Sequence, residues 1–166
     1  MKLIYSFLLF YLYSVTTYSQ NIRTICPIPG DLSENSGVLV SSSNSIWLHN
    51  DGGDLSMLYQ IDTFGNILRT ILIQNATNID WEDITHDNQG NVYIGDFGNN
   101  SNNRQNLKIY KIPHPDLVVG STVTAEIINY YYPEQTAFPP QNNEKKYYTE
   151  AMIYYQDALY VFTKDR

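Results

Sequence analysis

Residues 82–96 read EDITHDNQGNVYIGD, which is an apolar run, a polar turn and a second apolar run around an aromatic residue. Two other stretches have the same layout, SGVLVSSSNSIWLHN at 36–50 and EAMIYYQDALYVFT at 150–163. Their apolar-aromatic-apolar triplets fall in register, as Ile46-Trp47-Leu48, Val92-Tyr93-Ile94 and Leu159-Tyr160-Val161. The first two copies begin 46 residues apart (82 minus 36), close to the roughly 40 to 50 residues of a four-stranded propeller blade. The sequence therefore predicts a repeated β-hairpin.

Further strands are predicted after each of the first two hairpins. Residues 58–62 and 107–112 would be third strands, and residues 67–73 and 125–132 fourth strands, because all four segments are rich in β-branched and aromatic residues. Turn-forming residues separate them, and no segment shows sustained helical periodicity. We predict an all-β protein, namely a β-propeller of four-stranded antiparallel blades.

The predicted blades differ in length. Blade one would span about 36–73 and blade two about 80–132, and blade three would start at about 148 after a Pro/Gln/Asn-rich insertion at 133–146. The third copy has two strands before the sequence stops, whereas propellers typically have about four to eight blades. We expect an incomplete N-terminal arc of about two and a half blades, either a fragment or a chain that completes itself with another copy.

The first nineteen residues have the layout of a signal peptide. Lys2 supplies the positive charge, residues 3–15 are mostly apolar, and Thr17-Tyr18-Ser19 offers a small residue at the cleavage position. A membrane anchor is the less favoured alternative, because the apolar stretch is shorter than the roughly 20 residues that cross a bilayer. We expect a secreted or cell-surface protein with no stable membrane insertion.

The excess of acidic over basic side chains bears on which kinds of molecule the protein could bind. Loss of residues 1–19 would remove Lys2 alone among the charged residues, leaving nine basic against seventeen acidic side chains and a net charge of −8. Nucleic-acid binding needs clustered Lys and Arg, so it is excluded. The acidity fits a solvated surface or cation binding. The single Cys26 has no internal disulfide partner; it is either a buried small residue or bonded to another polypeptide.

Hairpin geometry brings several acidic positions to one edge. Pairing around the predicted turns sets Glu82 opposite Asp96, Ser36 opposite Asn50 and Glu150 opposite Thr163. In a propeller the innermost strand of every blade starts on the same face. A set of oxygen-bearing side chains should therefore converge on one channel rim: Glu82, Asp96, Asn50 and Glu150, with Glu34, Asp51 and Asp83 nearby.

Two interpretations of this rim are open. Ca²⁺ takes about 6 to 8 oxygen ligands, and clustered carboxylates with no Lys or Arg between them need a counter-ion. Alternatively, acidic and amide side chains cap the backbone N–H groups at strand ends. Both interpretations stand for Glu82 and Asp96, whereas capping is favoured for Asp83 and Asp51. The calcium-like segment 87–91 lies in a hairpin turn and is interpreted as a turn only.

Aromatic residues offer a second kind of candidate. Trp47, Tyr93 and Tyr160 share a mid-strand register, which favours packing between blades. Trp81 lies at the rim and has two possible roles, stacking on a ligand or packing at the blade top, of which packing is favoured. Motifs of catalytic nucleophiles, such as G-x-S-x-G, are absent from the sequence.

Several short sequence segments, taken together, resemble those of a group of exported bacterial β-propellers found in Bacteroidota. They are ENSG at 34–37, HND at 49–51, DWED at 80–83, YIGDFGNN at 93–100, Glu150-Ala151 and YVFTK at 160–164. The chain is more distantly similar to the SdiA-regulated and esterase-like phytase propellers. The resemblance implies a propeller of several blades with calcium sites, which carry over to Glu82, Asp96 and Glu150.

The leading functional hypothesis is a secreted β-propeller that acts as a binding or scaffold module, with Ca²⁺ at the channel rim. The alternative is a metal-dependent hydrolase of phosphoesters or lactones, in which a rim cation activates water and Glu82 or Asp96 is the base. A third hypothesis is a sugar-binding surface protein, which rests on the abundance of tyrosine and on Trp81. The expected partner is thus an unidentified ligand, either a carbohydrate or a protein. A binding module can work from one arc of blades, which favours binding over catalysis.

Export makes a testable prediction. Mass spectrometry of secreted material should find Gln20, or its cyclised form, at the N-terminus, because the apolar segment ends just before Thr17-Tyr18-Ser19. Recovery of intact Met1 from a membrane fraction would contradict the signal peptide.

Overall fold

A computed structural model describes residues 22–42, 44–141 and 145–164; the predicted signal peptide lies outside these ranges. The described residues form β-strands and two short 3-10 turns, η1 (Gly30–Leu32) and η2 (Pro115–Leu117), so the all-β prediction is confirmed. A search of this part of the chain finds no helix long and apolar enough to cross a membrane. The strands are β1 (Asn35–Ser42), β2 (Ser45–Asn50), β3 (Met57–Ile61), β4 (Ile67–Ile73), β5 (Trp81–His86), β6 (Val92–Asp96), β7 (Lys108–Ile112), β8 (Thr122–Val123), β9 (Glu126–Asn129), β10 (Tyr148–Tyr155) and β11 (Ala158–Lys164).

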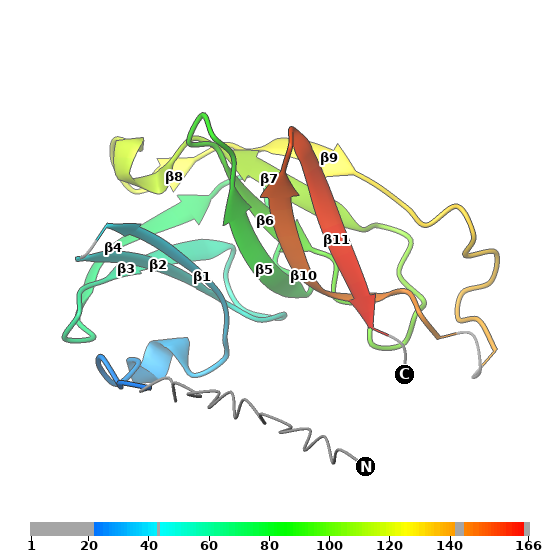
Figure 1. Cartoon of the computed structure of the whole chain (residues 1–166), viewed down its shortest axis with the longest axis horizontal. Helices are drawn as coiled ribbons and strands as arrows, with labels where there is room; N and C mark the ends of the chain where they lie inside the picture. Colours follow the sequence, from blue (N-terminus) through cyan, green and yellow to red (C-terminus); the bar gives the residue numbers. More distant parts are fainter. Residues whose placement is uncertain (1–21, 43, 142–144, 165–166) are drawn as a thin grey trace, which may run out of the picture.

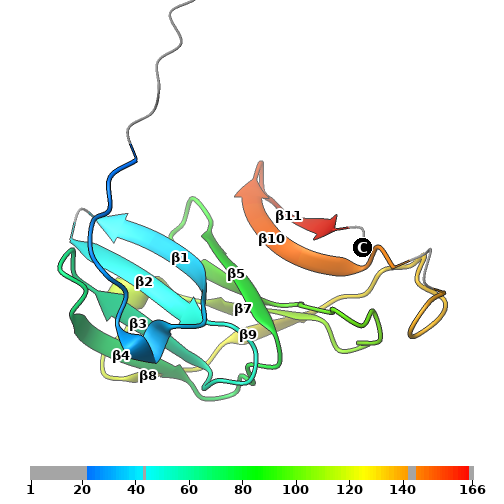
Figure 2. The same cartoon turned by 90° about the horizontal axis from the view of Figure 1, so that it is seen from below.

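The strands form three separate sheets (Figure 1). Sheet one has the order β1-β2-β3-β4-β8, sheet two has the order β5-β6-β7-β9, and β10 and β11 form hairpin three. Figure 2 shows the three sheets side by side in chain order, with sheet two in the middle. Neighbouring strands are antiparallel except for β8, which pairs parallel to β4. The described sheets do not close into a ring.

The first strands of the three repeats lie next to one another. The Ser36 hydroxyl in β1 donates a hydrogen bond of 2.7 Å to the Glu82 carbonyl in β5. On the other side of β5, the Asp83 carboxylate accepts a hydrogen bond of 2.6 Å from the backbone N–H of Met152 in β10. Each sheet is thus joined to the next along its first strand.

Each of the three inner hairpins contains a β-bulge at the same repeat position. The pairing skips Ser36 in β1, Glu82 in β5 and Glu150 in β10. The register predicted from the sequence is therefore wrong by one residue at this end of all three hairpins. Asp96 pairs with Trp81 rather than Glu82, Asn50 with Asn35 rather than Ser36, and Thr163 with Thr149 rather than Glu150. A bulge leaves its extra residue unpaired and re-aims the side chain, so the three bulges turn equivalent residues towards the same edge.

Two hairpin turns share the pattern Asp-x-x-Gly-Asn, at 62–66 and 87–91. The Asp87 carboxylate accepts hydrogen bonds from the backbone N–H groups of Gln89 and Asn91 and from the Asn91 amide. Gly90 has φ of +85°, which an L side chain rarely adopts. The interpretation of segment 87–91 as a turn is confirmed, because its acidic side chain is occupied by its own backbone.

The core lies between the sheets. One cluster joins Leu39 and Trp47 of sheet one to an aliphatic group on sheet two, which includes Ile84, Val92 and Ile94. A second cluster joins Tyr93 on the other face of sheet two to Met152, Leu159 and Val161 of hairpin three. The predicted packing role is confirmed for Trp47 and Tyr93. It is wrong for Tyr160 in the described structure, because this side chain remains 45% exposed.

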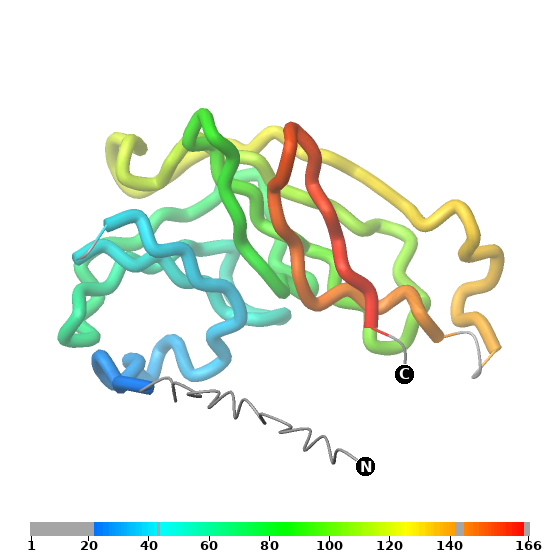
Figure 3. The backbone as a smooth tube through the Cα atoms, in the orientation of Figure 1, coloured from blue at the N-terminus to red at the C-terminus, as the bar shows by residue number. Residues whose placement is uncertain are grey.

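The segment between β7 and β9 returns to sheet one, as the tube in Figure 3 shows, and adds β8 beside β4. Asp116 accepts hydrogen bonds from the Trp47 indole N–H at 2.8 Å and from the Ser45 hydroxyl at 3.2 Å. Arg69 of β4 donates to the carbonyls of Val118 and Gly120. No pattern in the sequence predicts this connection, whose hydrogen bonds hold sheet one against sheet two.

Asp116→Ala should destabilise the protein by about 1 to 3 kcal/mol, since it leaves the buried Trp47 indole N–H without an acceptor. Urea denaturation should show a smaller effect in a Trp47→Phe background, where that donor no longer exists. An equal loss of unfolding free energy in both backgrounds would mean that the hydrogen bond contributes nothing.

Candidate functional site

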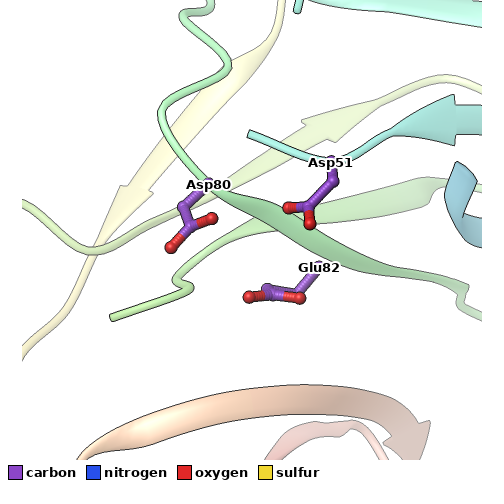
Figure 4. A group of neighbouring side chains, drawn as sticks. All are labelled: Asp51, Asp80 and Glu82. Carbon is purple, nitrogen blue, oxygen red and sulfur yellow. The ribbon is translucent and has the colours of Figure 1, made fainter. Parts of the chain in front are cut away.

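Three carboxylates meet at the edge where sheets one and two adjoin. Asp51 follows β2, Asp80 precedes β5, and Glu82 is the bulged residue of β5. One oxygen from each lies within 4.8 Å of the others. In Figure 4 the three side chains project into a common space, and we refer to them as the rim cluster.

The burial of Trp81 between the two acids accounts for part of this arrangement. Trp81 packs into the core, while Asp80, in the bend before β5, and Glu82, at the bulge, direct their carboxylates to the rim cluster. Asp51 is brought in by Asn78, whose amide donates to the Asp51 carbonyl at 2.8 Å and to the Asn50 carbonyl at 3.1 Å. The loop after β2 is therefore held against the start of β5.

Two glycines permit the close approach. A Cβ at Gly98 would overlap both the Asp80 and the Glu82 carboxylates. A Cβ at Gly52 would lie 2.5 Å from the Ile79 carbonyl oxygen and 2.8 Å from Asp80 Oδ1. Only glycine fits at these two positions without moving the rim cluster. The glycines of the loops 51–54 and 95–100 thus have a steric role beside the acidic groups.

Burial and the proximity of like charges disfavour ionisation of all three carboxyl groups of the rim cluster at once. Burial, followed by the charges of Asp51, Asp80 and Glu150, raises the pKa of Glu82 to about 8, although a hydrogen bond from Tyr148 opposes the shift. Burial and Asp51 also raise the pKa of Asp80, against the opposing charge of Arg104. A buried group of like charges is stabilised either by protons or by a bound cation.

Asp96, expected among the metal ligands, is placed differently. It is fully buried and forms an ion pair of 2.8 Å with Arg104, which also donates 2.8 Å to the Gly98 carbonyl. The same Asp96 oxygen accepts the Asp80 backbone N–H at 3.1 Å. The expectation that no basic residue lies among the rim acids is wrong, because Arg104 folds back from the loop after β6. Asp96 here is a capping and ion-pairing residue.

The other expected rim residues divide between two roles. Asn50, at the end of β2, connects the segment before β1 to the loop after β2. Its amide donates hydrogen bonds to the Asp31 carbonyl and to the Asp54 carboxylate. Glu150, at the third bulge, pairs with Lys164 at 3.5 Å and contributes to the raised pKa of Glu82. Glu150 therefore lies beside the rim cluster, whereas Asn50 supports the loop that holds Asp51.

Capping is confirmed for Asp83, whose two oxygens accept the backbone N–H groups of Ile84 at 2.8 Å and Met152 at 2.6 Å. Asp51 accepts the Gly52 N–H at 2.6 Å, as a cap does, yet it also belongs to the rim cluster. Glu34 contributes its carbonyl, which accepts the Asp51 N–H at 2.8 Å. The two predicted roles are therefore not exclusive at Asp51.

Trp81 packs in the core. Its ring has no exposed surface, lies 5.5 Å from the His49 ring and 5.9 Å from Tyr110, and its indole N–H donates to the Thr77 carbonyl. Such a ring offers no face to a ligand, so ligand stacking at Trp81 does not occur in this structure. His49 is also fully buried, and burial lowers its pKa.

Sequence reasoning missed Asp80. The usable signal was the pattern Asp80-Trp81-Glu82, in which two acids flank a large aromatic residue at a strand start, so that burial of the ring leaves both acids at the edge of the core. Asp51 was recognised as nearby only, because its approach depends on the long-range contact through Asn78.

A separate concave surface lies near the loop that carries Arg104. Its cavity has a volume of about 380 Å³, and its walls include Tyr130, Tyr131, Tyr132 and Phe138. Tyr130 and Tyr132 also pack on the core between sheet two and hairpin three. The cavity is more aromatic than the rim cluster and has no acidic side chain in its lining.

Comparisons with protein-family models, with curated proteins and with solved structures give no match. The resemblance to exported bacterial propellers therefore remains a hypothesis that rests on short sequence segments alone. The functional argument rests on the geometry and charge of the rim cluster.

The raised pKa of Glu82 predicts a pH-dependent stability in chelator. The pKa lies at about 8 in the folded protein and at an ordinary 4.5 when unfolded, so folding favours the protonated acid. This contribution is complete below about pH 4.5 and is lost as the pH rises through about 8. As the pH rises from about 5 to 9, the urea midpoint of Glu82→Gln should therefore increase relative to that of wild type. The control variant, at the exposed Glu134 (Glu134→Gln), should show the same pH profile as wild type. Parallel profiles for wild type and Glu82→Gln would contradict the perturbed carboxyl.

Proposed function

We propose that this protein is an exported β-propeller-type binding module that holds Ca²⁺ in the rim cluster. The observation that carries the proposal is the convergence of three carboxylates from two adjoining sheets within 4.8 Å. A cation placed among them would join the loop after β2 to the start of β5. The ion would thereby fix the edge at which sheets one and two meet.

The propeller part of the proposal is supported by the repeat geometry. The first strands β1, β5 and β10 are neighbours through Ser36 and Asp83, as the innermost strands of adjacent blades are in propellers. All three carry a bulge at the same repeat position. This equivalence indicates that each sheet is one unit of a repeating arrangement.

The calcium part is supported by the donor set. Hard oxygen ligands are what Ca²⁺ prefers, with about 6 to 8 in its shell, and carboxylates bind with one or both oxygens. Asp51, Asp80 and Glu82 would supply the charged ligands, with water or backbone carbonyls completing the shell. Gly98 and Gly52 leave the space that this approach needs. Burial is the main cause of the raised pKa of Glu82, and a divalent ion would offset the second cause, which is repulsion from the neighbouring carboxylates.

Calcium should raise the melting temperature of the protein relative to chelator. If Ca²⁺ binds only the folded state, the gain is RT ln(1 + [L]/Kd), about 2.7 kcal/mol at a hundredfold excess over Kd. Asp51→Asn and Glu82→Gln should each remove most of this calcium-dependent gain, because each takes one charged ligand from the rim cluster.

Asp96→Asn is the matched control. It breaks the buried ion pair with Arg104, so it should lower the melting temperature with and without calcium and keep the difference between the two. An unchanged wild-type midpoint in chelator would refute the calcium site. A calcium gain lost in Asp96→Asn but kept in Glu82→Gln would place the ion elsewhere.

A further inference from the structure

Hairpin three presents an apolar face to solvent. Ile153, Tyr155, Tyr160 and Phe162 are 47, 57, 45 and 50% exposed, and we call this group the open hairpin face. The four side chains lie on one side of the hairpin, since Ile153 pairs with Tyr160 and Phe162 is two residues further along β11. The opposite side packs on sheet two. Contiguous exposed apolar side chains of this kind mark an interaction surface.

The repeat indicates what covers such a face. Counted from the bulges, Trp47, Tyr93 and Tyr160 are equivalent positions, paired with Leu39, Thr85 and Ile153. Trp47 and Tyr93 are 0 and 7% exposed, because the next sheet packs on them. In both places the covering hairpin contributes three aliphatic residues at equivalent positions: Ile84, Val92 and Ile94 in the first, and Met152, Leu159 and Val161 in the second.

The chain carries the same aliphatic set once more, on the side of sheet one that faces away from sheet two. Val38, Ile46 and Leu48 occupy the three equivalent positions, with Val40 beside them, and we call these four residues the leading face. Leu48 and Ile46 pack against a cluster that includes Leu32, whereas Val38 and Val40 are 51 and 63% exposed. Figure 2 shows hairpin three and sheet one at opposite ends of the row of sheets.

We propose that the open hairpin face of one molecule packs against the leading face of a second copy of this chain. The contact would repeat between molecules the sheet-on-sheet packing seen twice within one molecule, using the exposed Val38 and Val40 as the covering side chains. Removal of both apolar faces from water drives it. It is a head-to-tail contact between two different surfaces, which builds rings or open chains of copies according to its rotation.

Light scattering on the size-fractionated exported chain tests the proposal. The wild-type mass should exceed that of one chain and rise with concentration. Tyr160→Lys and Val40→Lys should each reduce the mass to that of a single chain, because each variant places a charge in one of the two faces. Tyr131→Lys, at an aromatic residue 74% exposed outside both faces, is the matched control and should behave as wild type.

Mixing the two variants separates this contact from other kinds of association. Each variant keeps one intact face, so an equimolar mixture should form a one-to-one dimer although neither variant associates alone. Formation of that dimer also shows that both variants are folded. The proposal is overturned by a wild-type chain that stays at single-chain mass at all concentrations, by association of Val40→Lys alone, or by failure of the mixture to dimerise.

Discussion

Burial of Trp81 at the first position of β5 is the constraint on which the candidate site depends. The ring is enclosed between sheets one and two, packed on His49 and Tyr110, and its N–H is satisfied by the Thr77 carbonyl. An aromatic side chain of this size contributes strongly to core stability. Because Trp81 is held in the core, its neighbours Asp80, in the bend before β5, and Glu82, at the bulge, are fixed at the core edge, where both carboxylates enter the rim cluster.

The same packing creates an electrostatic cost at the rim. Asp80 and Glu82, fixed beside the core, meet Asp51 from the loop after β2. The raised pKa of Glu82 results first from its burial and then from repulsion among these carboxylates. Arg104 offsets the negative charge of Asp96, with which it forms a buried ion pair. Its positive charge also opposes the rise in the pKa of Asp80. A cation at this point would convert a destabilising group into a link between sheets, which connects the fold to the proposed function.

Local pattern was sufficient for much of the fold and for part of the site. The strand predicted at 67–73 coincides with β4, and the turn at 87–91 forms as its Asp-x-x-Gly-Asn pattern indicates. The bulge at Glu82, the return of Arg104 to Asp96 and the addition of β8 to sheet one depend on contacts between distant segments. Such contacts produce no periodic pattern in a single sequence. The sequence therefore did not indicate Asp80 as a site residue, and it placed Asp96 opposite Glu82 without predicting its ion pair with Arg104.

Isothermal titration calorimetry of Ca²⁺ into the purified protein at pH 7, repeated in two buffers of different ionisation enthalpy, is the most direct test of the central claim. With a pKa of about 8, Glu82 is largely protonated at this pH, and a ligating carboxylate must lose its proton. We predict one saturable site per chain and an apparent enthalpy that changes with the buffer in the direction of proton release. A titration without saturable heat in either buffer would contradict the account.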